Sequence, residues 1–208
     1  HDAFTTGNIS EKNCDSFVST IVGFKNLIDA YNPLSYRACA TAAMRNVKNG
    51  PDLVRIIAKA SGVNIDIISG QEEAAMILSK NINQYLKTKK NYIHIDVGGG
   101  STELTIIDKG KKITSKSFSI GSVRLLENKV QESYWKVMYD WIGKSTRSLD
   151  SIKAIGSGGN INKIASMLGQ YKGKSVHYND IKQIIKKISM KNIEERITEL
   201  GLRPDRAD

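Results

Sequence analysis

The spacing of apolar residues predicts alternating helices and strands over the first 86 residues of the chain. Apolar side chains that recur every three or four residues indicate amphipathic helices, and short unbroken apolar runs indicate buried strands. The expected elements are a helix from Ser10 to Asn32, a strand at 36–40, a helix from Pro51 to Gly62, a strand at 63–68, and a helix that opens at Gly70 and continues towards Tyr85. This alternation is typical of an α/β domain.

The pattern changes after residue 86. Residues 87–90, Lys-Thr-Lys-Lys, form a short polar break, and three strand-like runs follow closely enough to pair as a meander. The expected strands of the second half are 92–96, 102–108, 111–119 and 152–155, and the expected helices begin near residues 121, 133, 161, 178 and 192. We therefore predict two α/β lobes, residues 1–88 and 89–208.

The composition is that of an ordinary globular protein, 40% hydrophobic and 25% charged over 208 residues. No apolar run approaches the roughly 20 residues of a membrane span, and no signal peptide is expected. Cys14 and Cys39 are too few for a disulfide framework, so a reduced, cytoplasmic setting is the simplest interpretation. The chain begins at His1 and ends at Asp208, and both ends are interpreted as cut from a longer protein.

The net charge of +10 and the pI of about 9.5 favour polyanionic partners. The alternative is that a lysine-rich surface only reflects a biased composition. The lysines are spread along the chain and are not interleaved with aromatic residues that could stack on bases, so nucleic acid is the least favoured polyanion. Nucleotides and inorganic polyphosphate are the favoured ones.

A glycine-rich segment between two apolar strands carries the clearest chemical signal. The segment reads, in order, Asp96, Val97, Gly98, Gly99, Gly100, Ser101, Thr102 and Glu103. Consecutive glycines let backbone N–H groups approach an anion, and the adjoining hydroxyls and carboxylates suit phosphate with a divalent cation. A Walker A loop is excluded because no Gly-Lys-Ser/Thr follows, and a Rossmann fingerprint because a strand follows instead of a helix. A structural hairpin turn is the alternative, but it needs fewer glycines and polar residues.

A second glycine-rich loop, Gly156-Ser157-Gly158-Gly159, is expected between a strand and a helix. The N–H groups and the dipole at a helix N-terminus bind anions. A tight strand–helix connection is the alternative. Two such loops in one lobe favour a cleft that binds phosphate.

Several charged residues have both a structural and a chemical interpretation. Glu72 and Glu73 lie in the first turn of a predicted helix, where the dipole favours acidic residues without any function, yet a carboxylate there could act as a general base for water. Arg45 and Arg124 could be surface cations or bidentate phosphate ligands. His94, inside a strand, is expected to be a core or edge residue and is assigned no role.

The ordered set of motifs resembles the exopolyphosphatase/guanosine pentaphosphate phosphohydrolase (Ppx/GppA) family. The matching segments are residues 40–45, 68–74, 95–104, 120–125, 156–159 and 201–208, in family order over nearly the whole chain. The resemblance implies a two-lobed α/β fold of the actin-like ATPase type, which is ribonuclease H-like and has a cleft between the lobes. It also implies Mg²⁺-dependent hydrolysis of terminal phosphate from inorganic polyphosphate, guanosine pentaphosphate or both, and a link to the stringent response.

The resemblance implies roles for individual residues. Glu73 would position or deprotonate the attacking water, and Arg45 would pair with phosphate across the cleft. Asp96 and Glu103 would hold the divalent cation or its waters. Phosphate would be bound by two glycine loops and their neighbours, which are Gly98, Gly99, Gly100, Ser101, Thr102, Arg124, Gly156, Ser157 and Gly158.

The chain departs from the family pattern at three places. The opening strand with its Asp-x-Gly-Ser/Thr-Asn-type loop is absent, the sequence beyond Asp208 is absent, and the last loop reads Gly-Ser-Gly-Gly-Asn, where Asn160 could supply a polar contact. Half of the phosphate clamp and one cation ligand would lie in the absent loop. Two alternatives stay open: a kinase or ATPase of the same superfamily, and a regulator that binds guanosine tetraphosphate or polyphosphate without hydrolysis. The chain could form a homodimer, and no membrane association is expected.

Overall fold

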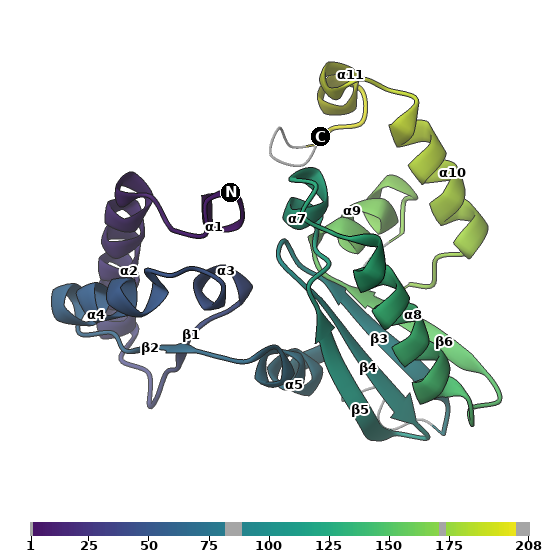
Figure 1. The fold of residues 1–208 in the computed structure, drawn as a ribbon, viewed down its shortest axis with the longest axis horizontal. Helices are drawn as coiled ribbons and strands as arrows, with labels where there is room; N and C mark the ends of the chain where they lie inside the picture. Colours follow the sequence, from purple (N-terminus) through teal and green to yellow (C-terminus); the bar gives the residue numbers. More distant parts are fainter. Residues whose placement is uncertain (1, 82–88, 171–173, 203–208) are drawn as a thin grey trace.

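The computed structural model describes residues 2–81, 89–170 and 174–202, which form an α/β fold (Figure 1). The elements of the first half are α1 (Asp2–Thr5), α2 (Glu11–Tyr31), β1 (Ala38–Ala40), α3 (Ala42–Arg45), α4 (Gly50–Ser61), β2 (Ile65–Ile67) and α5 (Gly70–Asn81). Those of the second half are β3 (Asn91–Val97), β4 (Thr102–Asp108), β5 (Lys111–Phe118), α7 (Ser122–Leu126), α8 (Glu132–Thr146), β6 (Ile152–Ser157), α9 (Gly159–Met167), α10 (Tyr178–Ser189) and α11 (Ile193–Thr198).

Helices α2 and α4 begin and end close to the predicted positions. Pro51 lies in the first turn of α4, where its missing N–H removes no intrahelical bond. Gly62 closes α4 in the left-handed conformation, with φ of 73°, and Asn32 closes α2 with φ of 43°. Ser10 precedes α2 as predicted, but its hydroxyl donates to the Asp2 carboxylate (2.7 Å) and accepts no hydrogen bond from the N–H groups of the helix. The one-turn helices α1 and α3 are not predicted from the sequence, because four residues are too few to show a helical period.

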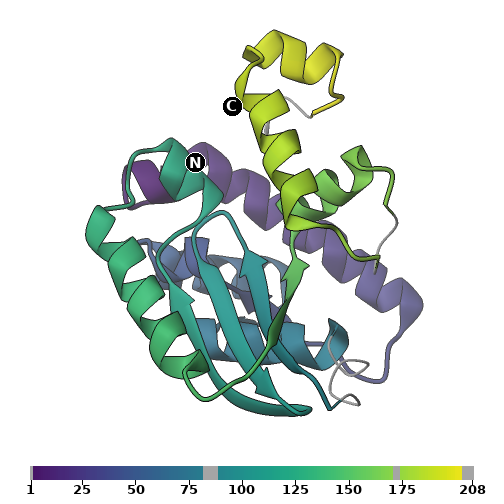
Figure 2. The ribbon, with the colours of Figure 1, turned by 90° about the vertical axis from the view of Figure 1, so that its right-hand side faces the viewer.

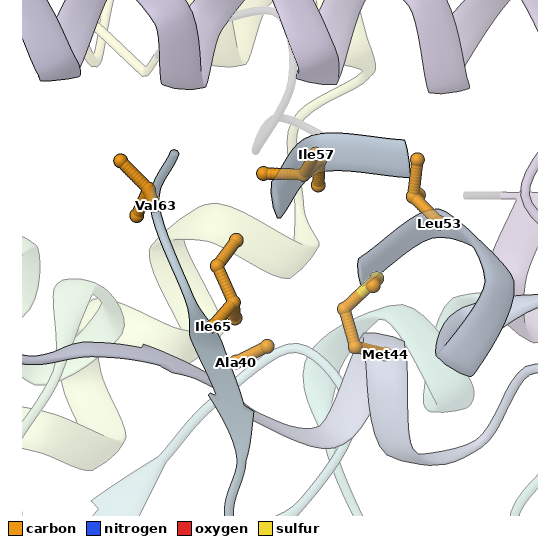
Figure 3. Packing of buried hydrophobic residues seen from close by; sticks show 6 residues of the cluster. All are labelled: Ala40, Met44, Leu53, Ile57, Val63 and Ile65. Carbon is orange, nitrogen blue, oxygen red and sulfur yellow. The ribbon is translucent and has the colours of Figure 1, made fainter. Parts of the chain in front are cut away.

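The core of the first half lies between α2, α4 and the two-stranded parallel sheet of β1 and β2. Buried apolar side chains from β1, α3, α4, β2 and the segment just before β2 converge there (Figure 3). They are Ala40, Met44, Leu53, Ile57, Val63 and Ile65. Partly buried residues of α2, including Phe17 and Ile21, pack against this cluster from the helix that the apolar spacing predicts.

We expect Ile57→Ala to lower the free energy of unfolding by about 2–5 kcal/mol, because the side chain is fully buried and its removal leaves a cavity. Ile56 is the matched control, since it is the preceding residue of the same helix and is 54% exposed. Ile56→Ala is expected to change stability by no more than about 0.5 kcal/mol. Urea denaturation of both variants tests this pair, and equal losses would contradict the position of the core.

The second half is built on a four-stranded sheet with the order β5-β4-β3-β6. Strand β4 pairs antiparallel with β3 and β5, which confirms the predicted meander, and β6 pairs parallel with β3. Helix α8 covers one face, where Met138 and Trp141 pack on Leu104 and Phe118. In Figure 2 the helices of the first half lie behind this sheet. Both faces of β4 are therefore buried, although Thr102, Glu103 and Thr105 interrupt its apolar residues.

Helix α5 connects the two halves, since it packs against β5 and β4. Phe118 of β5 packs against α8, and Ser117, the residue before it, lies against Gly70 of α5. Because side chains alternate along a strand, α5 meets the face of the sheet opposite α8. The predicted continuation of this helix to Tyr85 and the predicted lobe boundary at residue 88 lie outside the described residues, as does the 203–208 part of the last motif. Among the helices that the structure describes, none is both long and apolar enough to cross a membrane.

Candidate active site

The glycine loop between β3 and β4 is held by the start of helix α7. The carbonyl oxygens of Gly98 and Gly99 accept hydrogen bonds from the N–H groups of Ser122 (3.0 Å) and Val123 (2.9 Å). Within the described parts of the chain, the N–H groups of Gly99 and Gly100 have no protein acceptor. Backbone N–H groups in such a loop can bind an anion.

Two residues that the family resemblance assigns to phosphate binding, Thr102 and Arg124, form hydrogen bonds in and beside the glycine loop. The Thr102 side chain is buried, and its hydroxyl donates to the carbonyl oxygen of Ile120 (2.7 Å). Arg124 donates from Nε to the carbonyl oxygen of Gly100 (2.7 Å). These bonds fix the backbone of the loop, so a contact of either side chain with phosphate remains a prediction.

Four polar side chains form one row across the sheet, which we call the polar row: Ser117 on β5, Glu103 on β4, Asp96 on β3 and Ser157 on β6. Residues opposite each other in a sheet point to the same face. Ser117 lies against Gly70 of α5, so Glu103, which is opposite Ser117, also faces α5 and not α8. Glu103 is only 3% exposed, and its Oε1 accepts a hydrogen bond from Ser117 Oγ (2.8 Å). The two carboxylates predicted to handle a cation, Asp96 and Glu103, are thus direct neighbours in the sheet.

The second glycine loop lies beside the first. Ser157 ends β6 opposite Asp96, and Gly158 follows with φ of 99°, a conformation that only glycine adopts readily. A Cβ atom at Gly158 would lie 3.0 Å from Asp96 Oδ1 and 2.9 Å from the carbonyl oxygen of Val97. The parallel pairing of β3 and β6 therefore brings the two predicted loops together, as a shared phosphate site requires.

Arg45 and Glu73 approach the same face of the sheet from the first half. Arg45 ends α3 and donates from Nη1 to the carbonyl oxygen of Ile68 (2.5 Å). The same Nη1 lies 3.6 Å from Glu73 Oε2 on the first turn of α5. Gly70, the first residue of α5, lies directly against Ser117 of the polar row. The start of α5 therefore carries Glu73 to the sheet, and Arg45 lies beside it through its contacts with Ile68 and Glu73.

The adjacent carboxylates of Glu72 and Glu73 do different things. Glu72 accepts hydrogen bonds from the N–H (2.9 Å) and hydroxyl (3.0 Å) of Ser69, and its own N–H donates to that hydroxyl (3.2 Å). This is a capping box, which stabilises a helix start. Glu73 instead is mostly buried, and its Oε2 has no hydrogen-bond partner within the described structure. The purely structural interpretation of these acidic residues thus fits Glu72, and the chemical interpretation fits Glu73.

The environment of Glu73 is that of a carboxylate made more basic. Burial raises the pKa of Glu73 above its ordinary value, and the negative charge of Glu103 raises it further, while Arg45 acts in the opposite direction. The net shift is upward, so desolvation and like charge outweigh the ion pair. A carboxylate with a raised pKa is a stronger base for a proton from water.

This shift predicts a pH-dependent effect of Glu73→Gln on stability. Above the raised pKa the wild-type carboxylate is charged and buried, which costs stability that a neutral amide does not. We expect Glu73→Gln to be more stable than the wild type at pH 8, and the difference to shrink as the pH falls through the raised pKa and to vanish below about pH 4. Thermal denaturation in EDTA at several pH values measures it.

Glu72→Gln is the control for that experiment and should show the opposite sign. The bonds from Ser69 lower the pKa of Glu72, so its charged form stabilises the fold above its unfolded pKa and loses that effect as the pH falls. Glu72→Gln is therefore expected to be less stable than the wild type at pH 8. If both variants shifted stability in the same direction, the different environments of the two carboxylates would be refuted.

The carboxylates fit a divalent cation that is shared with phosphate. Among the described residues, no group of three or more His, Cys, Asp or Glu side chains could hold a metal by itself. Mg²⁺ is commonly bound by one or two carboxylates together with substrate phosphates and water. Asp96 and Glu103 provide such a pair, and the buried hydroxyl of Ser157, which lacks a protein partner within the described chain, adds a neutral oxygen in the same row.

His94 lies one pleat below Asp96 on the same face, opposite Thr105. Both side chains are buried, and the sequence-based expectation of a core residue is confirmed. Burial lowers the pKa of His94, which favours the neutral imidazole.

Two residues of the site, Gly70 and Ser117, are not singled out by the sequence patterns. Gly70 looks like an ordinary helix start, and Ser117 lies inside a predicted strand. A weak signal exists, because Ser115 and Ser117 place hydroxyls at alternate positions of a strand and so on one face of the sheet.

A sequence model of the Ppx/GppA phosphatase family matches residues 3–208. Exopolyphosphatase 1 of Mycobacterium tuberculosis (strain ATCC 25618 / H37Rv) is 26% identical over 122 residues, a match that covers 58% of this chain and 35% of that protein. The chain thus spans about a third of the length of that curated relative.

Solved structures share the fold. An exopolyphosphatase from Cytophaga hutchinsonii superposes with a TM-score of 0.77 at 22% identity, covering 99% of this chain and 73% of that chain. The type II variant of the Aquifex aeolicus Ppx/GppA phosphatase superposes with a TM-score of 0.67 at 25% identity, covering 99% of this chain and 74% of that chain.

Proposed function

Because the chain belongs to the Ppx/GppA phosphatase family, we propose that it hydrolyses the terminal phosphoanhydride bond of inorganic polyphosphate, guanosine pentaphosphate or both, with Mg²⁺. One observation carries this proposal. Glu73 is a buried carboxylate that lies beside Arg45, and its pKa is raised by burial and by the negative charge of Glu103. A general base, a positive charge and a carboxylate that can hold a metal ion are the groups that such a hydrolysis needs.

The proposed reaction uses the residues as follows. The terminal phosphate lies against the free N–H groups of Gly99 and Gly100, and water attacks its phosphorus atom. Glu73 accepts the proton of that water while the bridging P–O bond breaks, and the bridging oxygen leaves with the shortened chain. Arg45 favours the ionised form of Glu73. Its guanidinium has five N–H donors, so the bond to Ile68 leaves others for phosphate. Catalysis is then mostly positioning and electrostatic stabilisation.

Asp96 and Glu103 would hold the divalent cation or its waters, with Ser157 beside them. When bound, the cation would neutralise charge on the phosphate oxygens. The roles of the second loop, Gly156 to Gly158, and of Ser101 and Thr102 in phosphate binding stay part of the proposal.

Phosphate release from inorganic polyphosphate, guanosine pentaphosphate and ATP by the complete protein, with and without Mg²⁺, tests the function. We expect release from at least one of the first two and its loss in EDTA. Release from ATP alone would instead support a kinase or ATPase, and tight binding of polyphosphate or guanosine tetraphosphate without release would support a regulator.

Three further parts of the proposal concern the setting of the protein. The two lobes are residues 1–88 and 89–208, with the polyanion lying between them. The free cysteines Cys14 and Cys39 agree with a reduced, cytoplasmic location. A homodimer is the oligomer to test, by light scattering of the complete protein.

A further inference from the structure

Ser117 contacts two parts of the candidate site, the carboxylate of Glu103 and the start of helix α5. From β5 it stands opposite Glu103 in the sheet, and its Oγ donates to Glu103 Oε1 at 2.8 Å. The acceptor is a carboxylate that is only 3% exposed. A hydrogen bond to a buried charge is about twice as strong as one between neutral groups, and it fixes the orientation of the carboxylate.

The same residue also fixes the start of α5. A Cβ atom at Gly70 would lie 2.5 Å from Ser117 Cβ and 2.7 Å from its Oγ, so the helix touches Ser117 with no room for a side chain between them. Gly70 is the first residue of α5, and Glu73 follows within the same turn. The distance of Glu73 from the sheet therefore depends on the contact of Gly70 with Ser117.

We infer that Ser117 is a positioning residue that sets the geometry of Glu73 relative to Glu103. Its hydroxyl holds the Glu103 carboxylate, and its Cα and Cβ atoms support the helix start that carries Glu73. This inference rests on the proposed function, which gives the two carboxylates their roles as cation ligand and general base.

Ser117→Ala tests the hydrogen bond of the hydroxyl separately from the packing of the side chain, because it keeps the Cβ atom that contacts Gly70. We expect kcat to fall about 10-fold, the effect of losing one charge-assisted hydrogen bond. KM for polyphosphate should change less than about twofold, because the glycine loop that binds phosphate is untouched, and the Mg²⁺ concentration for half-maximal activity should rise by about 5–10-fold. Ser119→Ala, at an exposed serine two residues on, should leave all three quantities unchanged.

Gly70→Ala tests the contact of the helix with Ser117 while keeping the hydroxyl. It should lower kcat and the melting temperature, because the added Cβ displaces the start of α5. The double variant Gly70→Ala/Ser117→Gly adds a Cβ atom at residue 70 and removes the Cβ atom at residue 117 that it would collide with. We expect this double variant to regain the melting temperature but not the kcat, since the hydroxyl is still absent.

An unchanged kcat and Mg²⁺ response in Ser117→Ala would overturn the inference, and so would recovery of kcat in the double variant. If the wild-type complete protein released no phosphate at all, the proposed function would fail, but Mg²⁺ binding by isothermal titration calorimetry would still decide the matter of Ser117. Weaker Mg²⁺ binding by Ser117→Ala than by Ser119→Ala supports the positioning of Glu103, and equal binding refutes it.

Discussion

Glu73→Ala is expected to abolish phosphate release while leaving polyphosphate binding largely intact. A positioned general base contributes about 10²–10⁴-fold to a rate, and the buried carboxylate of Glu73 is the group placed for that role. The N–H groups that bind phosphate belong to another element, the glycine loop of Gly99 and Gly100, so affinity should survive. Phosphate release under saturating Mg²⁺ and calorimetric binding of polyphosphate by the complete protein measure the two effects.

Glu72→Gln is the matched control, one residue away on the same helix. Its carboxylate caps α5 through Ser69 and is exposed, so it should affect the stability of the helix start and not kcat. The role of Glu73 as general base would be refuted if Glu73→Ala released phosphate at a near-wild-type rate. It would also be refuted if Glu72→Gln lost as much activity as Glu73→Ala.

Gly121→Ala is expected to lower activity by about 10²-fold, because it displaces the phosphate loop. A Cβ at this position would lie 2.4 Å from the carbonyl oxygen of Gly99 and 2.6 Å from the nitrogen of Ser101. Both are backbone atoms, so the loop has to move, and misplacement of about 1 Å can cost that much in rate. Such overpacking should also lower the free energy of unfolding by about 1–3 kcal/mol. Kinetics and urea denaturation of one preparation measure both.

Gly143→Ala provides the comparison for this substitution. Gly143 lies within helix α8, and a Cβ there meets no atom within 4 Å. Alanine is favoured over glycine inside a helix by up to about 1 kcal/mol, so this variant should be slightly more stable and fully active. If Gly121→Ala behaved like Gly143→Ala, the close approach of Gly121 to the loop would be wrong.

The sequence predicts the long, strongly patterned elements to within a few residues. Strands β3 and β4, on either side of the glycine loop, and helix α4, with Pro51 and Gly62 at its ends, are where the pattern places them. The family and the α/β fold class are also confirmed. Helix α3 escapes prediction because a single turn shows no period. Arg45 lies at the end of this short helix, so its position in the fold is not predicted either.

The candidate site is less predictable, because it depends on contacts between distant residues. The glycine loop is a local pattern and can be recognised as such. Ser117 becomes relevant only through its pairing with Glu103, which lies 14 residues away. The sequence also cannot rank Glu72 against Glu73, since both lie in the first turn of a helix. Which of them faces the sheet is decided by how α5 packs.

The polar row has a consequence for the quality of refolded protein. Successive side chains on a strand point to opposite faces, so a slip of β4 by one residue would exchange Glu103 for Leu104. The carboxylate would then enter the apolar layer under Trp141, and a leucine would face Glu73. Such a molecule could keep its helices and strands, and circular dichroism would not detect the error. Activity per milligram would detect it, so it can serve as a measure of correct strand alignment in a preparation.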